Sequence, residues 1–544
     1  MKLSDQGLQD TQAWVTAGYE IPTYDRKAMV EKTKATPEWV HFGAGNLFKA
    51  FPAAVAEKLL KEGRMDEGVI AVEGFDPFIV EVNKEHDNLA VLATLKHDGN
   101  VEKTVVGSIA ETVLLNPEDK DAWARMTEIF EAPSLKMASF TITEKGYALT
   151  DASGNLLPQV KEDFENGPEA PVSYLGKVTA LLYRRYLDGR LPIAMVSMDN
   201  CSHNGQKLQD AITAYADAWA KNGKVEEGFV EYLNNPKEVS FPWSMIDKIT
   251  PRPDESVERM LEETGLEDVK PVKTPRGSFV APFVNAEETE YLIIEDAFPN
   301  GRVPLDEGGI IYTDRDTVNN VEKMKVTTCL NPLHTAMSIY GCLLDYHKIS
   351  EEMKDQDIVD LIKIIGYDEG LPVVVNPGIL DPKEFIDTVI NVRFPNPFMP
   401  DAPQRIATDT SQKLSVRFGE TIKSYLADKD LSVDDLKLIP YVFAGWMRYL
   451  MGIDDNGNAF EISADPLLEE VRPVVADIRL GDTVTEEQLR PILSNQKIFG
   501  VDLYETGLAD KVVDAFNQLI AGKGAVRKTL HEAVSAAKEA KAEK

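Results

Sequence analysis

The sequence predicts an α/β N-terminal domain with a mainly parallel sheet, followed by a C-terminal domain that is mostly α-helical. Three observations lead to this prediction. Apolar β-like runs alternate with amphipathic helical stretches up to about residue 315. Almost only helical periodicity follows from about residue 320 onward. A chain of 544 residues is also long enough for two or more domains. We therefore expect domains over 1–315 and 316–544, with 1–36 as a polar N-terminal extension.

The first strong element is a β-like run, Glu38–Phe42, followed by a glycine turn and a helical pattern over 47–62. A second β-like run over 69–72 ends at Glu73. Strand, glycine turn, helix and strand in this order form the opening unit of a dinucleotide-binding domain. Further strands are expected over 89–95, 137–142 and 193–197, with helices over 172–186 and 205–220.

In the second half of the chain, the stretch 332–346 is predicted to be a helix. Ala336, Ile339 and Leu343 recur there at spacings of three and four, which places them on one apolar stripe. The later patterns are helical as well, near 354–365, 379–391, 409–427, 434–452, 465–478, 485–495 and 509–522.

The charge balance narrows the class of partner. Asp and Glu number 90 against 58 Lys and Arg, a formal net charge of −32. This surplus argues against nucleic acid and against anionic membrane surfaces, which both need cationic contacts. An anionic small molecule would need a local group of cations to bind such a protein.

Three further observations concern metal sites, disulfides and location. The three cysteines include no CxxC pair, which argues against a disulfide framework and a cysteine zinc site. No HExxH motif occurs, so we predict no metal. No run of about 18 apolar residues and no apolar signal core occur, and we expect a cytoplasmic protein.

The glycine turn Gly43-Ala44-Gly45 lies between a predicted strand and a predicted helix, a context that suits a bound pyrophosphate. Phe48 stands at the third glycine position of GxGxxG, so a tight turn without a ligand stays an alternative. Glu73 could accept hydrogen bonds from an adenosine ribose, or could be an ordinary solvated acid at a strand end.

A second candidate position follows the predicted strand over 193–197, where the sequence reads Met198-Asp199-Asn200. The carboxyl ends of strands face the ligand crevice in open α/β sheets, so Asn200 could donate its amide to a substrate oxygen. The alternative is a turn, because Asp-Asn is a common turn pair.

Lys325, Asn331 and His334 form the third candidate group. Asn331 and Pro332 fit the N-cap and first position of a helix, and capping alone could explain this asparagine. The helix dipole would keep His334 neutral. A lysine in a partly apolar segment, like Lys325 after Met324, can serve as an acid or base. A surface lysine remains the alternative.

A proline-bracketed segment, Arg393–Pro397, carries one arginine in a stretch of restricted backbone. A guanidinium suits a carboxylate or paired hydroxyls, and a plain surface loop is the alternative. Lys413 follows in a segment that could cap a helix or add a second cation.

Taken together, these segments resemble the polyol-specific long-chain dehydrogenases, the mannitol dehydrogenase-like family, in the family's order along nearly the whole chain. The matching segments are His41–Asn46, Thr141–Tyr147, Ser197–Asn200, Phe241–Pro251, Ile294–Asp296, Lys325, Asn331–His334 and Arg393–Pro397.

The resemblance implies an NAD-dependent, metal-independent oxidoreductase that passes hydride between nicotinamide and a secondary alcohol or ketone. It implies that Lys325 is the general acid/base, that Asn200 and Asn331 hold the reacting oxygen, and that His334 orients substrate and lysine. Arg393, Asp247 and Lys413 are the expected substrate-binding residues. The expected cofactor-binding residues are Gly43, Ala44, Gly45, Asn46, Leu47, Glu73 and Glu144, the last also assisting proton release.

This sequence departs from the family pattern in two places. Lys325 and Asn331 are six residues apart instead of five, so either the loop carries an extra residue or Lys323 takes the lysine's place. The glycine loop continues Leu47-Phe48-Lys49, where Lys49 would replace an arginine as a cofactor-phosphate contact.

Among family members, the hexuronate-reducing ones are most similar, which implies a sugar-acid substrate. A polyol or ketose substrate, or a non-catalytic nucleotide-binding protein, remains an alternative. Glu73 favours NADH, because a carboxylate there would repel a 2′-phosphate. We expect a monomer or small homo-oligomer.

Overall fold

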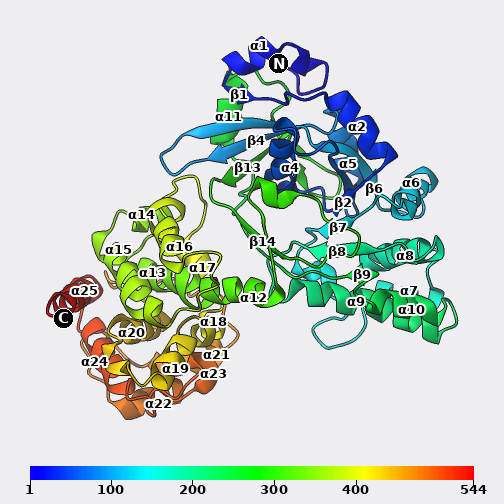
Figure 1. Cartoon of the computed structure of the whole chain (residues 1–544). Coiled ribbons are helices and arrows are strands. Elements are labelled where there is room, and N and C mark those ends of the chain that lie inside the picture. Colours follow the sequence, from blue (N-terminus) through cyan, green and yellow to red (C-terminus); the bar gives the residue numbers. More distant parts are fainter. The chain divides into compact units, whose positions relative to one another are not determined.

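The computed structural model describes residues 1–544, which divide into two compact units (Figure 1). The first unit contains Met1–Lys96 and Asn100–Asn319, and the second contains His97–Gly99 and Asn320–Lys544. No helix in either unit combines the length and apolar character needed to cross a membrane.

The first unit is built on a six-stranded sheet in which every neighbouring pair is parallel. Its strands stand in the order β6-β3-β2-β7-β8-β9. The chain enters at the centre, adds strands on one side and then returns to add strands on the other. The strand order therefore reverses between β2 and β7, the position at which open α/β sheets bind ligands. The strands are β2 (Trp39–Phe42), β3 (Val69–Glu73), β6 (Ile109–Leu114), β7 (Met137–Phe140), β8 (Ile193–Ser197) and β9 (Val239–Ser240).

Both faces of this sheet are covered, which explains why its strands are continuous apolar runs. On β2, Val40 and Phe42 belong to one core cluster and Trp39 belongs to the other. The helices of this unit are α1 (Thr11–Thr16), α2 (Arg26–Ala35), α3 (Asn46–Ala50), α4 (Pro52–Lys61), α5 (Pro77–Glu85), α6 (Lys120–Glu131), α7 (Pro158–Asn166), α8 (Tyr174–Leu187), α9 (Asn204–Lys221), α10 (Glu227–Asn234) and α11 (Glu255–Glu263).

Three sequence-based expectations for this unit need correction. The predicted helix over 47–62 is two helices, α3 and α4, which are separated at Phe51 (φ −126°, ψ −80°). Pro52 disfavours helical backbone at the residue before it. The run 89–95 forms β4, which pairs antiparallel with β5 in a second sheet and not in the parallel one. The segment 1–36 is part of the fold, because Leu3 and Trp14 are fully buried.

The second sheet has the order β1-β5-β4-β13, and a third has the order β10-β14-β15. The strands of these sheets and of one short hairpin are β1 (Tyr19–Glu20), β4 (Ala90–Leu95), β5 (Val101–Val106), β10 (Ser244–Asp247), β11 (Val272–Lys273), β12 (Phe279–Val280), β13 (Phe283–Glu287), β14 (Tyr291–Glu295) and β15 (Ile311–Thr313).

The second unit is helical (Figure 1), so the α/β domain followed by a helical domain is confirmed. Two helices that are buried over nearly their whole length, α13 and α20, pack against each other. The helices are α12 (Arg315–Met324, which joins the units), α13 (Asn331–Leu343), α14 (Ile349–Glu352), α15 (Gln356–Lys363), α16 (Pro382–Thr388), α17 (Pro403–Ile406), α18 (Thr410–Leu414), α19 (Glu420–Ala427), α20 (Leu438–Leu450), α21 (Leu468–Val475), α22 (Glu486–Leu493), α23 (Gln496–Phe499), α24 (Ala509–Leu519) and α25 (Ala525–Ala542).

Four π-helical turns interrupt these helices: η4 (Lys325–Cys329), η5 (Ile364–Gly370), η7 (Val389–Arg393) and η8 (Ser415–Gly419). The turn η4 lies beside both η5 and η8. The segment after Lys325, which has a β-like sequence, is therefore π-helical. Turns of this kind are rare and are frequent at functional sites, so their clustering marks this part of the unit.

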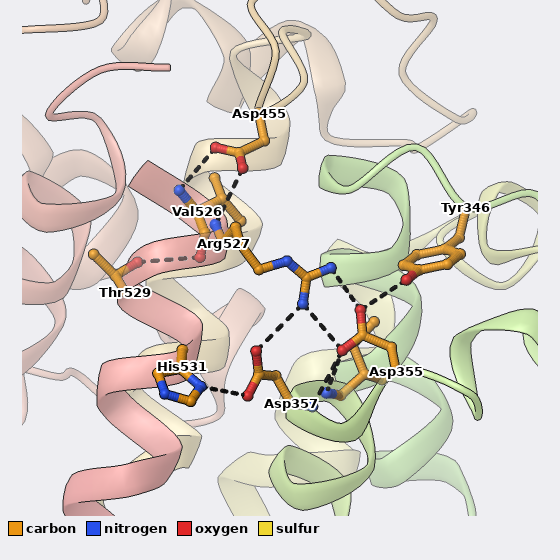
Figure 2. Close-up of polar contacts among 9 residues, drawn as sticks. Tyr346, Asp355, Asp357, Asp455, Val526, Arg527, Thr529 and His531 are labelled. Atoms are coloured by element: carbon orange, nitrogen blue, oxygen red, sulfur yellow. Dashed lines mark hydrogen bonds and ion pairs between the residues drawn. The ribbon is translucent and has the colours of Figure 1, made fainter. Parts of the chain in front are cut away.

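The C-terminal helix α25 continues to Ala542 and is held by ion pairs to the rest of the second unit. Figure 2 shows Arg527 between Asp355 and Asp357, with Nη2 2.6 Å from Asp355 Oδ2 and Nη1 3.4 Å from Asp357 Oδ2. His531 Nδ1 lies 2.9 Å from Asp357 Oδ1. Farther along, Lys538 pairs with Asp360, Lys541 with Asp368 and Lys544 with Asp435.

Candidate functional site

The glycine turn after β2 leaves its backbone accessible to a ligand. Gly43 has φ +113°, and a Cβ placed there would lie 2.2 Å from the carbonyl oxygen of Thr141, so no other residue fits. Its N–H donates to Val72 O at 2.8 Å. A Cβ on Gly45 would meet nothing within 4 Å, so open space lies against the backbone there. This turn stands where the strand order reverses, and Asn46 and Leu47 follow it as the first residues of α3.

Glu73 lies at the carboxyl end of the neighbouring strand β3 and is buried. Its Oε1 accepts hydrogen bonds from the backbone N–H groups of Phe75 at 2.8 Å and Asp76 at 3.1 Å. Burial raises the pKa of this carboxyl group. Glu73 is therefore not the solvated acid of the alternative interpretation. Glu73 Oε1 fixes the loop after β3 by accepting these two hydrogen bonds. A ribose hydroxyl would have to use the lone pairs of the carboxylate that these bonds leave unoccupied.

His41 and Lys49 support the turn from inside. The ring nitrogens of His41 contact Ser139 Oγ at 2.6 Å and Thr141 Oγ1 at 2.7 Å. Burial lowers the pKa of His41 to about 3, so the imidazole is neutral. Lys49 Nζ donates to Asn83 Oδ1 at 2.9 Å, and burial lowers its pKa to about 8. Lys49 is a buried residue, and its contact with a cofactor phosphate stays a prediction.

Asn200 is exposed at the carboxyl end of β8, and two neighbours fix the backbone around it. The carboxylate of Asp199 accepts hydrogen bonds from the N–H groups of Ile142 at 3.0 Å and Thr143 at 2.9 Å. Thr143 has φ +64°, a strained backbone for a β-branched residue. The buried amide of Asn204 donates to Ser197 O at 3.2 Å and Asp199 O at 3.0 Å.

Sequence reasoning did not assign a role to Asn204 or Asp199. The only sequence signal for Asp199 was its position next to Asn200 in the same motif. Glu144 is largely exposed and pairs with Lys207 at 2.6 Å. Asp247 is buried at the end of β10, in a different sheet from the glycine turn. The glycine turn, Glu73 and Asn200 thus share the carboxyl edge of one sheet, and Asp247 does not belong to that sheet.

In the second unit, Lys325 is buried at the start of η4 and follows the fully buried Met324. Lys323 is exposed. The π-helical turn closes over one residue more than an α-helical turn, which accommodates the six-residue spacing to Asn331. These observations favour Lys325 over Lys323 as the lysine in an apolar setting.

Asn331 is the first residue of α13, and Leu330 occupies the N-cap with no side-chain cap, so the capping interpretation is wrong. The Oδ1 atom of Asn331 is buried and has no hydrogen-bond partner. Buried polar atoms in proteins are almost always bonded, so an orphan acceptor here points to a missing donor.

His334 lies one turn farther along α13 and stacks on Phe394 with ring centroids 5.1 Å apart. Burial lowers its pKa to about 3, and the next contributions come from four cations. These are Arg417, Arg405, Arg393 and Lys413. Arg393 is buried at the end of η7, which excludes a plain surface loop.

The second unit therefore places Lys325, Asn331, His334, Arg393 and Lys413 on a connected set of elements, and their roles stay predictions. Sequence reasoning missed two members of the cationic group, Arg405 and Arg417. Arg417 is four residues after Lys413, and that helical spacing was the signal that both share a face. No cluster of His, Cys, Asp and Glu side chains that could hold a metal ion is found in the structure.

Comparison with known proteins decides the family. A model described as the mannitol dehydrogenase Rossmann domain matches residues 37–306, and one described as the mannitol dehydrogenase C-terminal domain matches residues 317–520. The chain belongs to the mannitol dehydrogenase family. As a member of this family it is an oxidoreductase, and the resemblance seen in the sequence is confirmed.

This family member is 50% identical over 538 residues to a D-mannonate oxidoreductase of Thermotoga maritima, covering 98% of this chain and 99% of that protein. It is 29% identical to a mannitol 2-dehydrogenase of Aspergillus fumigatus, covering 92% and 93% of the two chains.

Two solved structures share its fold. A D-sorbitol dehydrogenase in substrate-free form gives a TM-score of 0.79 at 24% identity, over 96% of this chain and 99% of that one. A Pseudomonas fluorescens mannitol 2-dehydrogenase in ternary complex with NAD and D-mannitol gives 0.67 at 25% identity, over 98% and 100%.

Proposed function

We propose that this protein is an NAD-dependent oxidoreductase of sugar acids that reduces D-fructuronate to D-mannonate and catalyses the reverse reaction. The observation that carries the proposal is the 50% identity to a D-mannonate oxidoreductase over 98% of the chain. The cationic group around His334 agrees with an anionic substrate, because the chain as a whole carries a charge of −32.

The dinucleotide is proposed to bind to the N-terminal domain, residues 1–315. The Gly43–Leu47 backbone would hold its pyrophosphate, since the open Cβ position of Gly45 leaves room for close approach. Glu73 would take the ribose side, and Glu144 would stand near the proton exit. When bound, NAD would accept a hydride from the alcohol during oxidation, and NADH would donate a hydride to the ketone during reduction.

The substrate is proposed to bind to the C-terminal domain, residues 316–544, where the acid/base chemistry needs no metal. The Lys325 ammonium would give a proton to the ketone oxygen during reduction and take it back during oxidation. The amide donors of Asn331 and Asn200 would stabilise the developing alkoxide. The orphan Oδ1 of Asn331 would accept a hydrogen bond from a substrate hydroxyl.

His334, neutral across the physiological range, would orient the substrate through one donor and one acceptor nitrogen. Arg393 and Lys413 would bind substrate oxygens, and Asp247 is proposed to contact the substrate or support the residues that do. These roles are those that the family resemblance implies for the matching positions.

A substrate panel tests the function. The purified protein is assayed at 340 nm with NADH or NADPH and D-fructuronate, D-tagaturonate or D-fructose, and with NAD and D-mannonate. We expect NADH with D-fructuronate to give the highest kcat/KM. Higher turnover of D-tagaturonate or D-fructose would make the protein a tagaturonate reductase or a mannitol 2-dehydrogenase. NADH binding without turnover across the panel would make it a non-catalytic nucleotide-binding protein.

A further inference from the structure

The partly buried Arg417 on η8 differs from the fully buried Arg185 in how few of its donors are used. Arg185 is fully buried and makes five hydrogen bonds to backbone carbonyls, those of Phe130, Ala132, Leu135, Leu191 and Pro192. Arg417 makes one, from Nη1 to Thr335 Oγ1 at 2.6 Å. No carboxylate lies within the 4.0 Å of an ion pair. Four of the five N–H groups of this guanidinium thus have no protein acceptor.

Lys413, one helical turn before Arg417, is a second cation without a carboxylate partner. Its Nζ donates only to the carbonyl oxygen of Ile406 at 2.9 Å. Burial, and next to it the charge of Arg417, lower the pKa of Lys413 to about 8. The nearby Asp465 already accepts from Ser411 N at 2.9 Å and Leu467 N at 3.0 Å.

Placing two cations together with no carboxylate in ion-pair contact opposes folding, because both desolvation and mutual repulsion cost free energy. Asp409 and Asp465 offset only part of this effect on the pKa of Lys413. The chain has 90 acidic residues, yet none of them forms an ion pair with Arg417 or Lys413. A stabilising role in the fold does not account for it. Preorganisation for an anionic ligand does.

The position of Arg417 connects it to the proposed reaction centre. Its hydrogen bond to Thr335 fixes the guanidinium beside the neighbouring His334 on α13. The turn η8 that carries it lies beside η4, which begins at Lys325. A hydrogen bond of 3.4 Å from Thr421 Oγ1 to Thr327 O joins the segment after η8 to η4.

We propose that Arg417, together with Lys413, is the receptor for the substrate's carboxylate, and that this pair sets the preference for sugar acids over uncharged sugars. The inference rests on the proposed function and deepens it. The unused N–H groups of Arg417 would form a bidentate pair with the two carboxylate oxygens, while Thr335 holds the plane of the guanidinium. Lys413 would add a point charge.

The test compares D-fructuronate with D-fructose, which carries CH₂OH where the acid carries its carboxylate. For R417Q we expect kcat/KM for D-fructuronate to fall about 100-fold, mainly through KM, as for loss of a charge-assisted pair. We expect kcat/KM for D-fructose to change less than about threefold. R417K should recover part of the loss. K423Q is the matched control, since Lys423 is exposed, pairs with Glu420 and follows on α19.

A second measurement separates ligand binding from folding. Because R417Q removes an unpaired, partly buried charge, its Tm should equal or exceed that of the wild type, and its Kd for NADH should be unchanged. Equal losses with both substrates, an unchanged acid-to-ketose ratio, or a Tm lower by several degrees would overturn the inference. A wild type that prefers D-fructose would instead contradict the proposed function itself.

Discussion

His41 beneath the glycine turn provides a prediction whose size follows from the structure. The side chain is fully buried on β2, and both ring nitrogens are hydrogen-bonded to hydroxyl groups. Burial lowers its pKa to about 3, whereas an unfolded chain has a histidine pKa near 6.5. The unfolded state therefore binds the proton first as the pH falls. The stability contributed by the neutral ring is complete above pH 6.5 and is lost progressively toward pH 3.

The magnitude between pH 8 and pH 5 is about 2 kcal/mol. It equals 1.36 kcal/mol multiplied by the 1.5 pH units that separate pH 5 from the unfolded pKa. Any folded-state pKa below about 4 gives nearly the same result, since the native ring is then neutral at pH 5. The buried Glu57, whose pKa burial raises to about 7, acts with the opposite sign, but it is common to wild type and variant and cancels in their difference.

The assay compares wild type with H41Q by hydrogen exchange of the β2 and β7 amides at pH 8 and pH 5, after correction for intrinsic exchange rates. We expect the stability gap between wild type and variant to shrink by about 2 kcal/mol at pH 5. The loss of hydrogen bonds in H41Q affects both pH values and does not alter this change. Equal pH dependence of the two proteins would refute the reasoning, because it would mean that native His41 accepts a proton as readily as the unfolded chain.

The remaining predictions concern the turn and the C-terminal helix. G43A should destabilise the first unit by about 2 kcal/mol or more in denaturant unfolding, because its Cβ would meet Thr141 O at 2.2 Å and its φ is +113°. G45A is its control for folding, since the added Cβ meets nothing, and it should keep wild-type stability while weakening NADH binding in a fluorescence titration. A G43A variant as stable as the wild type, or an unchanged NADH affinity in G45A, would contradict these two expectations. R527M should lower the free energy of unfolding of the second unit by about 1–2 kcal/mol and speed amide exchange along α25. Because Arg527 is partly exposed, salt screens its ion pairs, so 1 M NaCl should reduce the difference between R527M and wild type. Equal amide exchange rates along α25 in R527M and wild type would mean that the ion pairs of Arg527 with Asp355 and Asp357, shown in Figure 2, do not hold this helix.

Local sequence signals predicted the first unit well because its elements have local causes. The β2 strand, the turn at Gly43 and the strand ending at Glu73 follow from continuous apolar runs and from a backbone position that only glycine fits. The failure at β4 has a different cause. Its apolar run predicts a strand, but which sheet the strand joins depends on pairing with distant segments such as β13.

Several features of the second unit depend on tertiary packing and cannot be predicted from local sequence. Val326, Thr327 and Thr328 favour a strand by propensity, yet packing against η5 and η8 makes the segment π-helical. The same turn moves Asn331 from the N-cap into the helix, which no pattern of residue types reveals. Arg417 was missed because what sets it apart, the lack of a carboxylate partner, is a property of the three-dimensional arrangement.

The most direct test of the central claim is hydride transfer by K325M, with K323M as its matched control because Lys323 is exposed. Single-turnover oxidation of NADH by D-fructuronate is followed at 340 nm, with NADH affinity measured separately. We expect wild type and K323M to react alike, and K325M to lose about 10³-fold in rate while keeping its Kd for NADH. A K325M rate within tenfold of wild type, or a loss in K323M instead, would contradict the account of a lysine-dependent sugar-acid oxidoreductase.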